Sequence, residues 1–314
     1  MLTDAEVQSI IARVRGRVAA TTGPGQAGAA LRAADELGAA EALLGDGIHP
    51  SIDAAVGAAH SAFLAFTEMG MESRRTVVEA MRAAMLREGE RLAYLAHAET
   101  GLGRADDKVQ KNLLVTTRTP GPEDLEPQAV TGDGGMTVTE YAPYGVIGSI
   151  TPTTNPTSTI INNSIAMISA GNAVTFNVHP GAAQVSVENI KLLNQAIVGA
   201  GGPPDLITAT PRPTLESAKE LMQHPDVRVL LVTGGPAVVG EAMRTPKKAI
   251  TAGPGNPPAV VDQTADVNQA GIDIVRGASF DNNIICVDEK TTIVVDTVAD
   301  KLLRAMVNAG AYRL

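Results

Sequence analysis

From about residue 145 onward, short apolar runs alternate with longer segments whose apolar residues recur at helical spacing. An apolar run of four to eight residues between turn residues is typical of a buried strand. Strands that alternate with helices predict β-α units and a parallel sheet. The predicted strands cover 145–150, 172–178, 205–208 and 227–232, and the helices after them run to about 169 and over 182–198, 214–223 and 237–244.

The preceding part of the chain, residues 31–120, has a mainly helical pattern. Predicted helices cover about 51–66, 73–88 and 90–99, and the last is expected to end at Gly101, because glycine adopts the left-handed conformation common at helix C-termini. Residues 119–135 are rich in Pro, Gly and acidic residues and predict a loop. Residues 136–141 alternate and predict a β segment, so that β structure is expected near 130–142.

A second, smaller α/β segment follows the Gly- and Pro-rich run 251–258, which is typical of a hinge. We expect two domains, 31–250 and 251–314. In the second, strands are predicted over 259–262 and 291–295, helices over 267–278 and up to 308, and a loop leading to Cys286.

Residues 1–20 predict a short amphipathic helix, followed by a flexible linker over 21–30. The helix could dock into a groove on a partner protein, or it could pack on its own domain. It does not resemble a secretory signal, because acidic residues come first and arginines follow the apolar positions. The apolar stripe of this helix comprises Val7, Ile10, Ile11, Val14 and Val18.

Composition excludes several function classes. The net charge is −9 and aromatic residues make up 3% of the 314 residues, which argues against a nucleic-acid partner. No apolar run approaches the roughly 20 residues that span a bilayer, so we expect no membrane segment. One Cys cannot form a disulfide framework within the chain, and the five His residues have no metal-ligand spacing. We therefore expect a soluble, intracellular protein without a metal.

Four features of the chain could carry chemistry, and each also has a purely structural interpretation. Cys286 is either a nucleophile for a carbonyl carbon or a small buried hydrophobe. Asn155 could donate to an oxyanion or cap a helix. The turn Thr233–Gly235 could bind a phosphate at a helix N-terminus or simply join a strand to a helix, and His179 could be a ligand or a turn residue.

Four motifs occur together in the order 150–156, 176–181, 252–258 and 280–286. On these motifs the chain resembles the aldehyde dehydrogenase superfamily, and within it the CoA-acylating enzymes of bacterial microcompartments. The resemblance implies an α/β fold, in which a doubly wound parallel-sheet cofactor domain is joined to an incomplete α/β catalytic domain. Superfamily members continue well past the position that matches Leu314, so the chain resembles a form truncated at its C-terminus.

The resemblance also implies roles for individual residues. Cys286 matches the nucleophile and Asn155 the oxyanion donor, NAD is the implied cofactor, and CoA is the implied co-substrate. Hydrolytic members carry a water-activating Glu near the hinge, whereas residues 251–255 contain no carboxylate, which is typical of the acylating branch. The implied cofactor-binding residues are Ile150, Thr151, Pro152, Thr153, Thr154, His179, Pro180, Gly181, Thr233, Gly234, Gly235 and Gly253.

The function implied by the resemblance is NAD-dependent oxidation of a short-chain aldehyde to acyl-CoA through a thioester on Cys286. Two alternatives stay open, namely a hydrolytic enzyme that releases a free acid and a catalytically inactive cargo protein. Residues 1–20 resemble encapsulation peptides, which implies contact with a microcompartment shell protein and a location in the cytoplasm within that compartment. A homo-oligomer is expected for the full-length protein.

Overall fold

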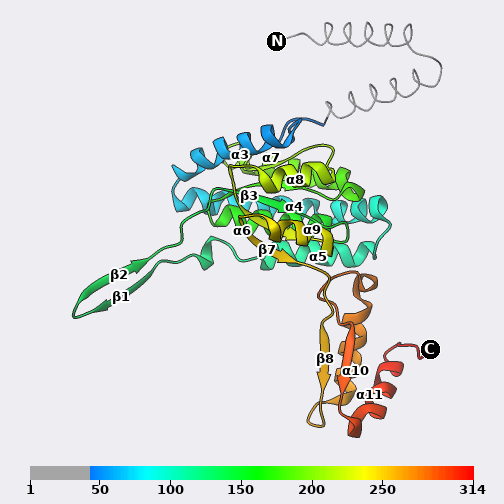
Figure 1. Cartoon of the computed structure of the whole chain (residues 1–314). Helices are drawn as coiled ribbons and strands as arrows, with labels where there is room; N and C mark the ends of the chain where they lie inside the picture. Colours follow the sequence, from blue (N-terminus) through cyan, green and yellow to red (C-terminus); the bar gives the residue numbers. More distant parts are fainter. Residues whose placement is uncertain (1–42) are drawn as a thin grey trace, which may run out of the picture. The chain divides into compact units, whose positions relative to one another are not determined.

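The central feature of the computed structural model, which describes residues 43–314, is a five-stranded parallel sheet. Its strands are ordered β5-β4-β3-β6-β7. Figure 1 labels β3 and β7 of this sheet among the surrounding helices. The prediction of a parallel sheet after residue 145 is confirmed. The strands are β3 (Val146–Ile150), β4 (Ala173–Asn177), β5 (Ile207–Ala209), β6 (Val227–Thr233) and β7 (Lys248–Ala252).

Helices cover both faces of this sheet, and as a result all residues of β3 and β4 are buried. Two helices, α3 and α8, contact each other and the central strands, while α6 and α7 contact each other and are covered by α4. These helices and strands share one hydrophobic core. The helices are α3 (Ile52–Thr67), α4 (Met71–Thr100), α5 (Ala105–Arg118), α6 (Pro156–Ser169), α7 (Ala183–Gly199), α8 (Leu215–Gln223) and α9 (Pro236–Arg244).

One continuous helix, α4, replaces the two helices predicted over 73–88 and 90–99. The prediction of two helices was wrong, because the helix continues through Gly89. In the fold, Gly89 lies where α5 packs on α4, and its carbonyl accepts a hydrogen bond of 2.8 Å from the Asn112 amide. This contact stabilises a residue that helices otherwise disfavour. The predicted end at Gly101 is confirmed, since Gly101 adopts a left-handed φ of 66°.

The strand order places a ligand-binding crevice between β3 and β6. From β3 the chain winds through β4 to β5 on one side, and then crosses back to β6 and β7 on the other. In open parallel sheets, ligands bind outside the carboxyl ends of strands at such a reversal. The loops that follow β3 and β6 are 151–155 and 234–235, and together with Thr233 at the end of β6 they contain most of the residues singled out from the sequence.

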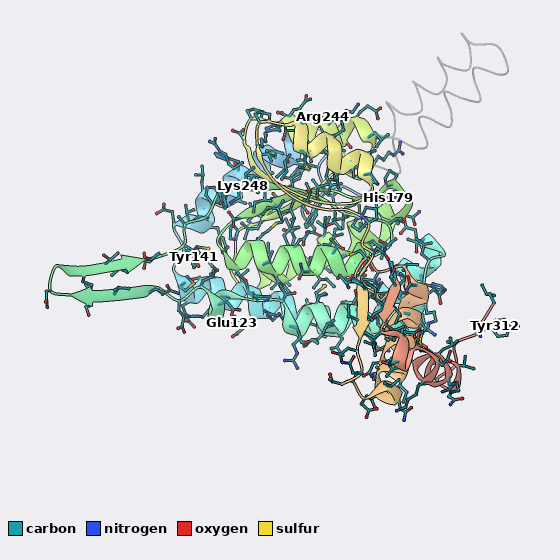
Figure 2. All side chains as sticks on the ribbon, turned by 60° about the horizontal axis from the view of Figure 1, so that its bottom comes forward. Glu123, Tyr141, His179, Arg244, Lys248 and Tyr312 are labelled. Atoms are coloured by element: carbon teal, nitrogen blue, oxygen red, sulfur yellow. The ribbon has the colours of Figure 1, made fainter. Side chains whose placement is uncertain are left out.

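A β-hairpin occupies part of the region predicted as a loop. Strands β1 (Gln128–Gly132) and β2 (Gly135–Thr139) pair antiparallel, so the predicted β segment is confirmed, but the loop over 119–135 is wrong where β1 lies. Every residue of both strands is exposed, and Figure 2 shows the ribbon extending beyond Tyr141 with only its own side chains around it. A short 3₁₀ turn, η1 (Pro122–Asp124), precedes it.

The C-terminal segment forms a second, smaller α/β arrangement. Strands β8 (Pro258–Val261) and β9 (Thr291–Val294) pair in parallel, and α10 (Val267–Ser279) packs on α11 (Asp296–Asn308). This segment has its own small apolar core around Ile274 and Leu302. The predicted hinge begins too early, since Thr251 and Ala252 pair with β6 as the end of β7.

The boundary between domains 31–250 and 251–314 stays a prediction. The predicted helix over 1–20 and linker over 21–30 lie outside the described residues. Within residues 43–314, no helix is both long and apolar enough to cross a membrane, and no cluster of His, Cys, Asp and Glu side chains could hold a metal ion.

Candidate active site

A cleft of about 520 Å³ lies at the carboxyl ends of β3, β4 and β6. Every residue predicted for the site from the sequence lines it except Gly181. Cys286 and Asn155, which are 131 positions apart in the chain, therefore face the same space as the strand-end loops. No site role was predicted for the other lining residues. Five of them lie in the motifs singled out from the sequence, namely Asn177, Val178, Pro254, Gly255 and Ile284, and six do not, namely Thr214, Leu215, Ala218, Ala237, Val238 and Lys290.

The end of the cleft near β3 and β6 has features that fit a dinucleotide. Helix α9 begins at Pro236 directly after the turn Thr233–Gly235, so its first N–H groups are free for a phosphate. The buried Thr151 hydroxyl has no hydrogen-bond partner within the described part of the chain. Gly181 shapes the neighbouring turn instead of lining the cleft, because its N–H donates to His179 Nδ1 at 3.0 Å.

Cys286 follows a tight loop in which three consecutive residues have left-handed backbone conformations. The φ angles of Asp281, Asn282 and Asn283 are 45°, 56° and 60°. Asp and Asn tolerate this region better than other residues with a side chain. The first two angles interrupt the 3₁₀ turn η3 (Phe280–Asn283) and direct the chain from α10 back toward the cleft.

Side chains of the same segment hold this loop in place. The Asn283 amide donates to the carbonyls of Ala278 at 2.7 Å and Glu289 at 3.1 Å. Lys290, at the edge of the cleft, donates to the carbonyls of Asn283 and Ile285 at 3.2 and 2.9 Å. The position of the loop that leads to Cys286 is therefore set by polar contacts on both sides of this cysteine.

The hinge loop approaches Cys286 closely from the other side. A Cβ atom at Gly255 would overlap the carbonyl oxygen of Cys286. Only glycine fits this contact between two backbone segments. The cysteine is partly buried between them.

Asn155 stands at the N-terminus of α6 but does not cap it, because its side chain makes no capping hydrogen bond. Its Oδ1 accepts a 2.6 Å hydrogen bond from Lys111 Nζ, and its Nδ2 donates to Thr154 Oγ1 at 3.1 Å. An amide nitrogen has two hydrogens, so one N–H is left for a ligand in the cleft. Asn155 is therefore the N-cap residue of α6 by position, but its side chain is engaged with Lys111 and Thr154 and not in a capping hydrogen bond.

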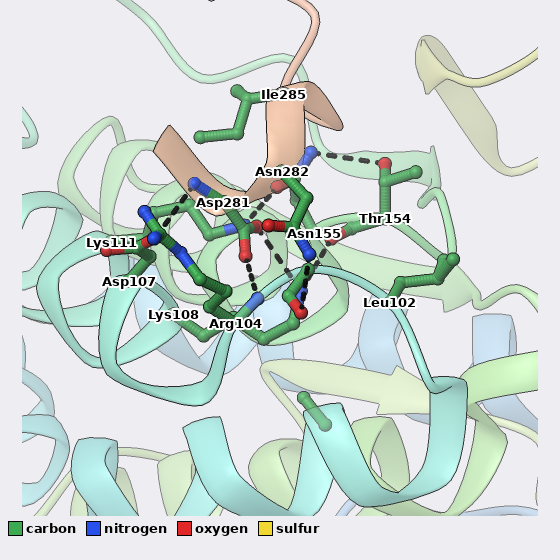
Figure 3. A network of polar contacts seen from close by, with 12 residues as sticks. Leu102, Arg104, Asp107, Lys108, Lys111, Thr154, Asn155, Asp281, Asn282 and Ile285 are labelled. Carbon is green, nitrogen blue, oxygen red and sulfur yellow. Dashed lines mark hydrogen bonds and ion pairs between the residues drawn. The ribbon is translucent and has the colours of Figure 1, made fainter. Parts of the chain in front are cut away.

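Behind Asn155, helix α5 presents a buried face that is polar, while Leu113 and Leu114 on the same helix are exposed. Two of its residues, Lys108 and Lys111, contact the carboxylate of Asp281, which is fully buried. Figure 3 shows these contacts between α5 and the ribbon of η3. Sequence reasoning missed this network because lysines and acids on a helix usually face solvent.

Further contacts join α5 to the nucleophile loop. The backbone N–H of Arg104 donates to Asp281 Oδ1 at 2.7 Å, and the backbone N–H of Asp281 donates to Asp107 Oδ2 at 2.8 Å. The Arg104 guanidinium pairs with Asp107 at 2.6 Å. The sequence of α5 shows an apolar side and a charged side, but it does not show which side the rest of the chain covers. The network could therefore not be predicted from the sequence.

Burial governs the charges around the site. Desolvation lowers the pKa of Lys111 to about 8, although its hydrogen bond with Asp281 acts in the opposite direction. Desolvation also raises the pKa of Asp288, whose carboxylate accepts the N–H of Ile285 at 3.2 Å. Among the described residues that line the cleft, none is Asp or Glu, so the lining offers a thiol, two amides, hydroxyls, the His179 imidazole and the Lys290 ammonium group, but no carboxylate.

Comparison with protein families finds one family model, described as "Aldehyde dehydrogenase family", which matches residues 45–311. Among curated proteins, the chain is 46% identical over 281 residues to a propanal dehydrogenase (CoA-propanoylating) from Citrobacter freundii. The match covers 89% of the chain and 61% of that enzyme. The chain thus spans about three fifths of the length of this relative.

Solved structures show the same likeness. A propionaldehyde dehydrogenase from Rhodopseudomonas palustris, with bound CoA and an acylated cysteine, has 45% identity and a TM-score of 0.83, and the match covers 86% of the chain and 62% of that structure. A propionaldehyde dehydrogenase from the fucose utilisation bacterial microcompartment of Clostridium phytofermentans has 42% identity and a TM-score of 0.81, with 84% and 60% covered.

Proposed function

Because the chain belongs to the aldehyde dehydrogenase family, we propose that it catalyses NAD-dependent oxidation of a short-chain aldehyde to the corresponding acyl-CoA. The observation that carries this proposal is the cleft in which Cys286 and Asn155 meet the loops after β3 and β6. The relatives with bound CoA or a CoA-propanoylating activity support it.

Cys286 acts as the nucleophile. Its thiolate attacks the aldehyde carbon, and the carbonyl oxygen gains the negative charge of a tetrahedral adduct. The free N–H of Asn155 stabilises that oxygen by a hydrogen bond, an interaction that strengthens as charge develops. Loss of hydride from the adduct leaves a thioester on Cys286.

The strand-end loops bind the cofactor. Bound NAD⁺ supplies the acceptor for the hydride. The N-terminal N–H groups of α9, after Gly235, suit its phosphates, and the unpartnered Thr151 hydroxyl is a further group that a dinucleotide would satisfy. His179 and Pro180 line the same cleft after β4.

CoA completes the reaction. Its thiol attacks the thioester, acyl-CoA leaves, and the Cys286 thiolate is restored, so that one aldehyde, one NAD⁺ and one CoA give acyl-CoA, NADH and a proton. Hydrolysis of the thioester would need a base to activate water. The described lining has no carboxylate for this task, which favours CoA over water as the acceptor.

The test is NADH formation by the full chain with propionaldehyde and NAD⁺, with and without CoA. We expect steady formation with CoA and, without it, a burst of about one NADH per active site followed by a stall, as an acyl-enzyme accumulates. Cys286→Ala should abolish both. Steady formation of NADH and free acid without CoA would support the hydrolytic alternative, and no NADH under either condition would support the inactive one.

The proposal extends to location. A relative of known structure comes from a bacterial microcompartment, and residues 1–20 have the amphipathic pattern of a docking helix. We infer that these residues contact a shell protein and bring the enzyme into such a compartment. Residues 1–20 fused to a fluorescent protein should form puncta in shell-producing cells, and Ile11→Glu should make the fluorescence diffuse. Diffuse fluorescence of the unsubstituted fusion would refute the inference.

A further inference from the structure

Lys111 makes two polar contacts that link the two reactive parts of the cleft. Its Nζ donates to Asn155 Oδ1 at 2.6 Å and also contacts Asp281 in the loop that leads to Cys286. The lysine is 6% exposed and does not line the cleft. It therefore reaches the site only through these two residues (Figure 3).

The contact with Asn155 decides which way the amide faces. An ammonium group can only donate hydrogen bonds, so it requires the amide oxygen opposite it. If the amide turned by 180°, its NH₂ group would face the ammonium, and two donors would oppose each other. Lys111 thus keeps Oδ1 toward α5 and leaves Nδ2 to Thr154 and to the cleft.

Lys108 provides an internal comparison. It lies one helical turn before Lys111, is also buried, and is 3.4 Å from the same Asp281 oxygen. Its other hydrogen bond goes to the backbone carbonyl of Thr154 at 3.3 Å and not to the Asn155 side chain. The two lysines share the nucleophile loop as a partner but differ in their contact with the oxyanion donor.

We propose that Lys111 is a positioning residue that orients the Asn155 amide toward the reacting carbonyl and holds it in register with the Cys286 loop. This role rests on the proposed function, because it requires an oxyanion in the cleft. Lys111 touches neither substrate nor cofactor in this scheme. Its effect on the reaction can therefore pass only through Asn155 or through the Cys286 loop, and an alkylation rate that stays unchanged assigns it to Asn155.

Acyl transfer from propionyl-CoA to Cys286 isolates this role. The Cys286 thiolate attacks the thioester carbon, a tetrahedral oxyanion forms, and the CoA thiolate leaves, so that Cys286 carries the propionyl group without any redox step. Intact-mass measurement follows this transfer in the full chain. Alkylation of Cys286 by iodoacetamide is the control, since displacement of iodide forms no oxyanion and needs no amide donor.

We expect Asn155→Ala to slow acyl transfer by about 10²–10³-fold, the usual effect of losing an oxyanion donor. Lys111→Met should slow it by about 10–10²-fold, because misplacing a catalytic group by about 1 Å has effects of this size. Neither change should alter the alkylation rate by more than about twofold. The double variant should be no slower than Asn155→Ala, because a residue that acts through another adds nothing once that residue is gone.

Lys108→Met is the matched control and should slow acyl transfer far less than Lys111→Met. If Lys111→Met does not fold, Lys111→Gln and Lys108→Gln give the same comparison, since glutamine is too short to bridge both partners. Equal effects at the two lysines, or rate losses that multiply in the double variant, would overturn the role of Lys111 alone. Failure of the unsubstituted chain to accept the propionyl group while its thiol alkylates would overturn the proposed function, and the role of Lys111 with it.

Discussion

The buried carboxylate of Asp281 predicts a large and specific loss of stability on substitution. It is fully buried and faces two buried cations, Lys108 and Lys111. Asp281→Asn keeps the size of the side chain and its tolerance of a left-handed backbone, but removes the charge. Asp281→Ala also removes the oxygen that accepts the Arg104 N–H at 2.7 Å.

The expected magnitude follows from these contacts. Removing one partner of a buried ion pair typically costs about 3–5 kcal/mol, so this is the expected loss in the free energy of unfolding for Asp281→Asn. Asp281→Ala should lose about 1 kcal/mol more for the missing hydrogen bond and about 1 kcal/mol for the left-handed φ of 45°. The loss of stability is limited because Lys111, whose pKa is already lowered to about 8, can release its proton and so avoid a buried charge without a partner.

Urea unfolding measured by circular dichroism checks this estimate. With a slope of about 2–3 kcal/mol per molar urea, a loss of 4 kcal/mol lowers the midpoint by about 1.3–2 M. The control is Glu241→Gln, which breaks an exposed pair with Arg244 at 2.6 Å and should change stability by less than about 1 kcal/mol. Ordinary surface substitutions change the free energy of unfolding by no more than about 0.5 kcal/mol. If both Asp281 variants stay within about 0.5 kcal/mol of the unsubstituted chain, the network does not hold the loop.

Two further predictions concern the cleft. Gly255→Ala should destabilise the chain by about 1–3 kcal/mol, because the new Cβ would overlap the Cys286 carbonyl, while Gly253→Ala, where nothing lies within 4 Å, should leave the melting temperature unchanged. The ratio of the acyl-transfer rate to the alkylation rate is independent of the thiolate fraction of Cys286, because both reactions use the thiolate. This ratio should fall as the pH rises through about 8, because Lys111, which faces Asp281, Lys108 and Asp288, then loses its proton and Asn155 loses a charged hydrogen-bond donor. Lys111→Met should make the ratio independent of pH.

The sheet could be predicted from the sequence because its signals are local. Each central strand is a short apolar run between turn residues, and each loop that follows carries small or polar residues. The pattern of apolar and polar residues does not predict the order of the strands in the sheet, because that order depends on where the chain crosses from β5 to β6. Only the second strand of the hairpin was predicted, from the alternation over 136–141. The first strand, β1, was missed although Asp133-Gly134 is a common hairpin dipeptide, because the Pro, Gly and acidic residues of 119–135 are typical of a loop.

The candidate site was only half accessible to sequence reasoning. Most residues that line the cleft lie in motifs or strand-end turns quoted from the sequence, and their roles came from the resemblance, whereas six, such as Thr214 and Lys290, lie outside them. The residues behind them were missed, because a lysine in a helix carries no mark of burial until its neighbours are known. Helix α5 shows the difficulty, since Leu113 and Leu114 suggest an apolar face that the fold leaves exposed, while Lys108 and Lys111 are enclosed.

The buried polar network of Lys108, Lys111 and Asp281 costs desolvation free energy, which suggests that it serves to orient the groups it contacts. Buried charges pay a desolvation penalty that apolar side chains of the same volume avoid, so stability alone does not explain two lysines and an aspartate in this position. Directional contacts do explain them. An apolar cluster could hold α5 against η3, but it could not distinguish the two ends of the Asn155 amide. The Lys111 ammonium does so, because it can only donate and therefore pairs with the amide oxygen. The same Asp281 carboxylate that balances the lysines also receives the Arg104 N–H, which fixes the start of the nucleophile loop. The orientation of the Asn155 amide and the placement of the Cys286 loop therefore depend on one set of buried charges.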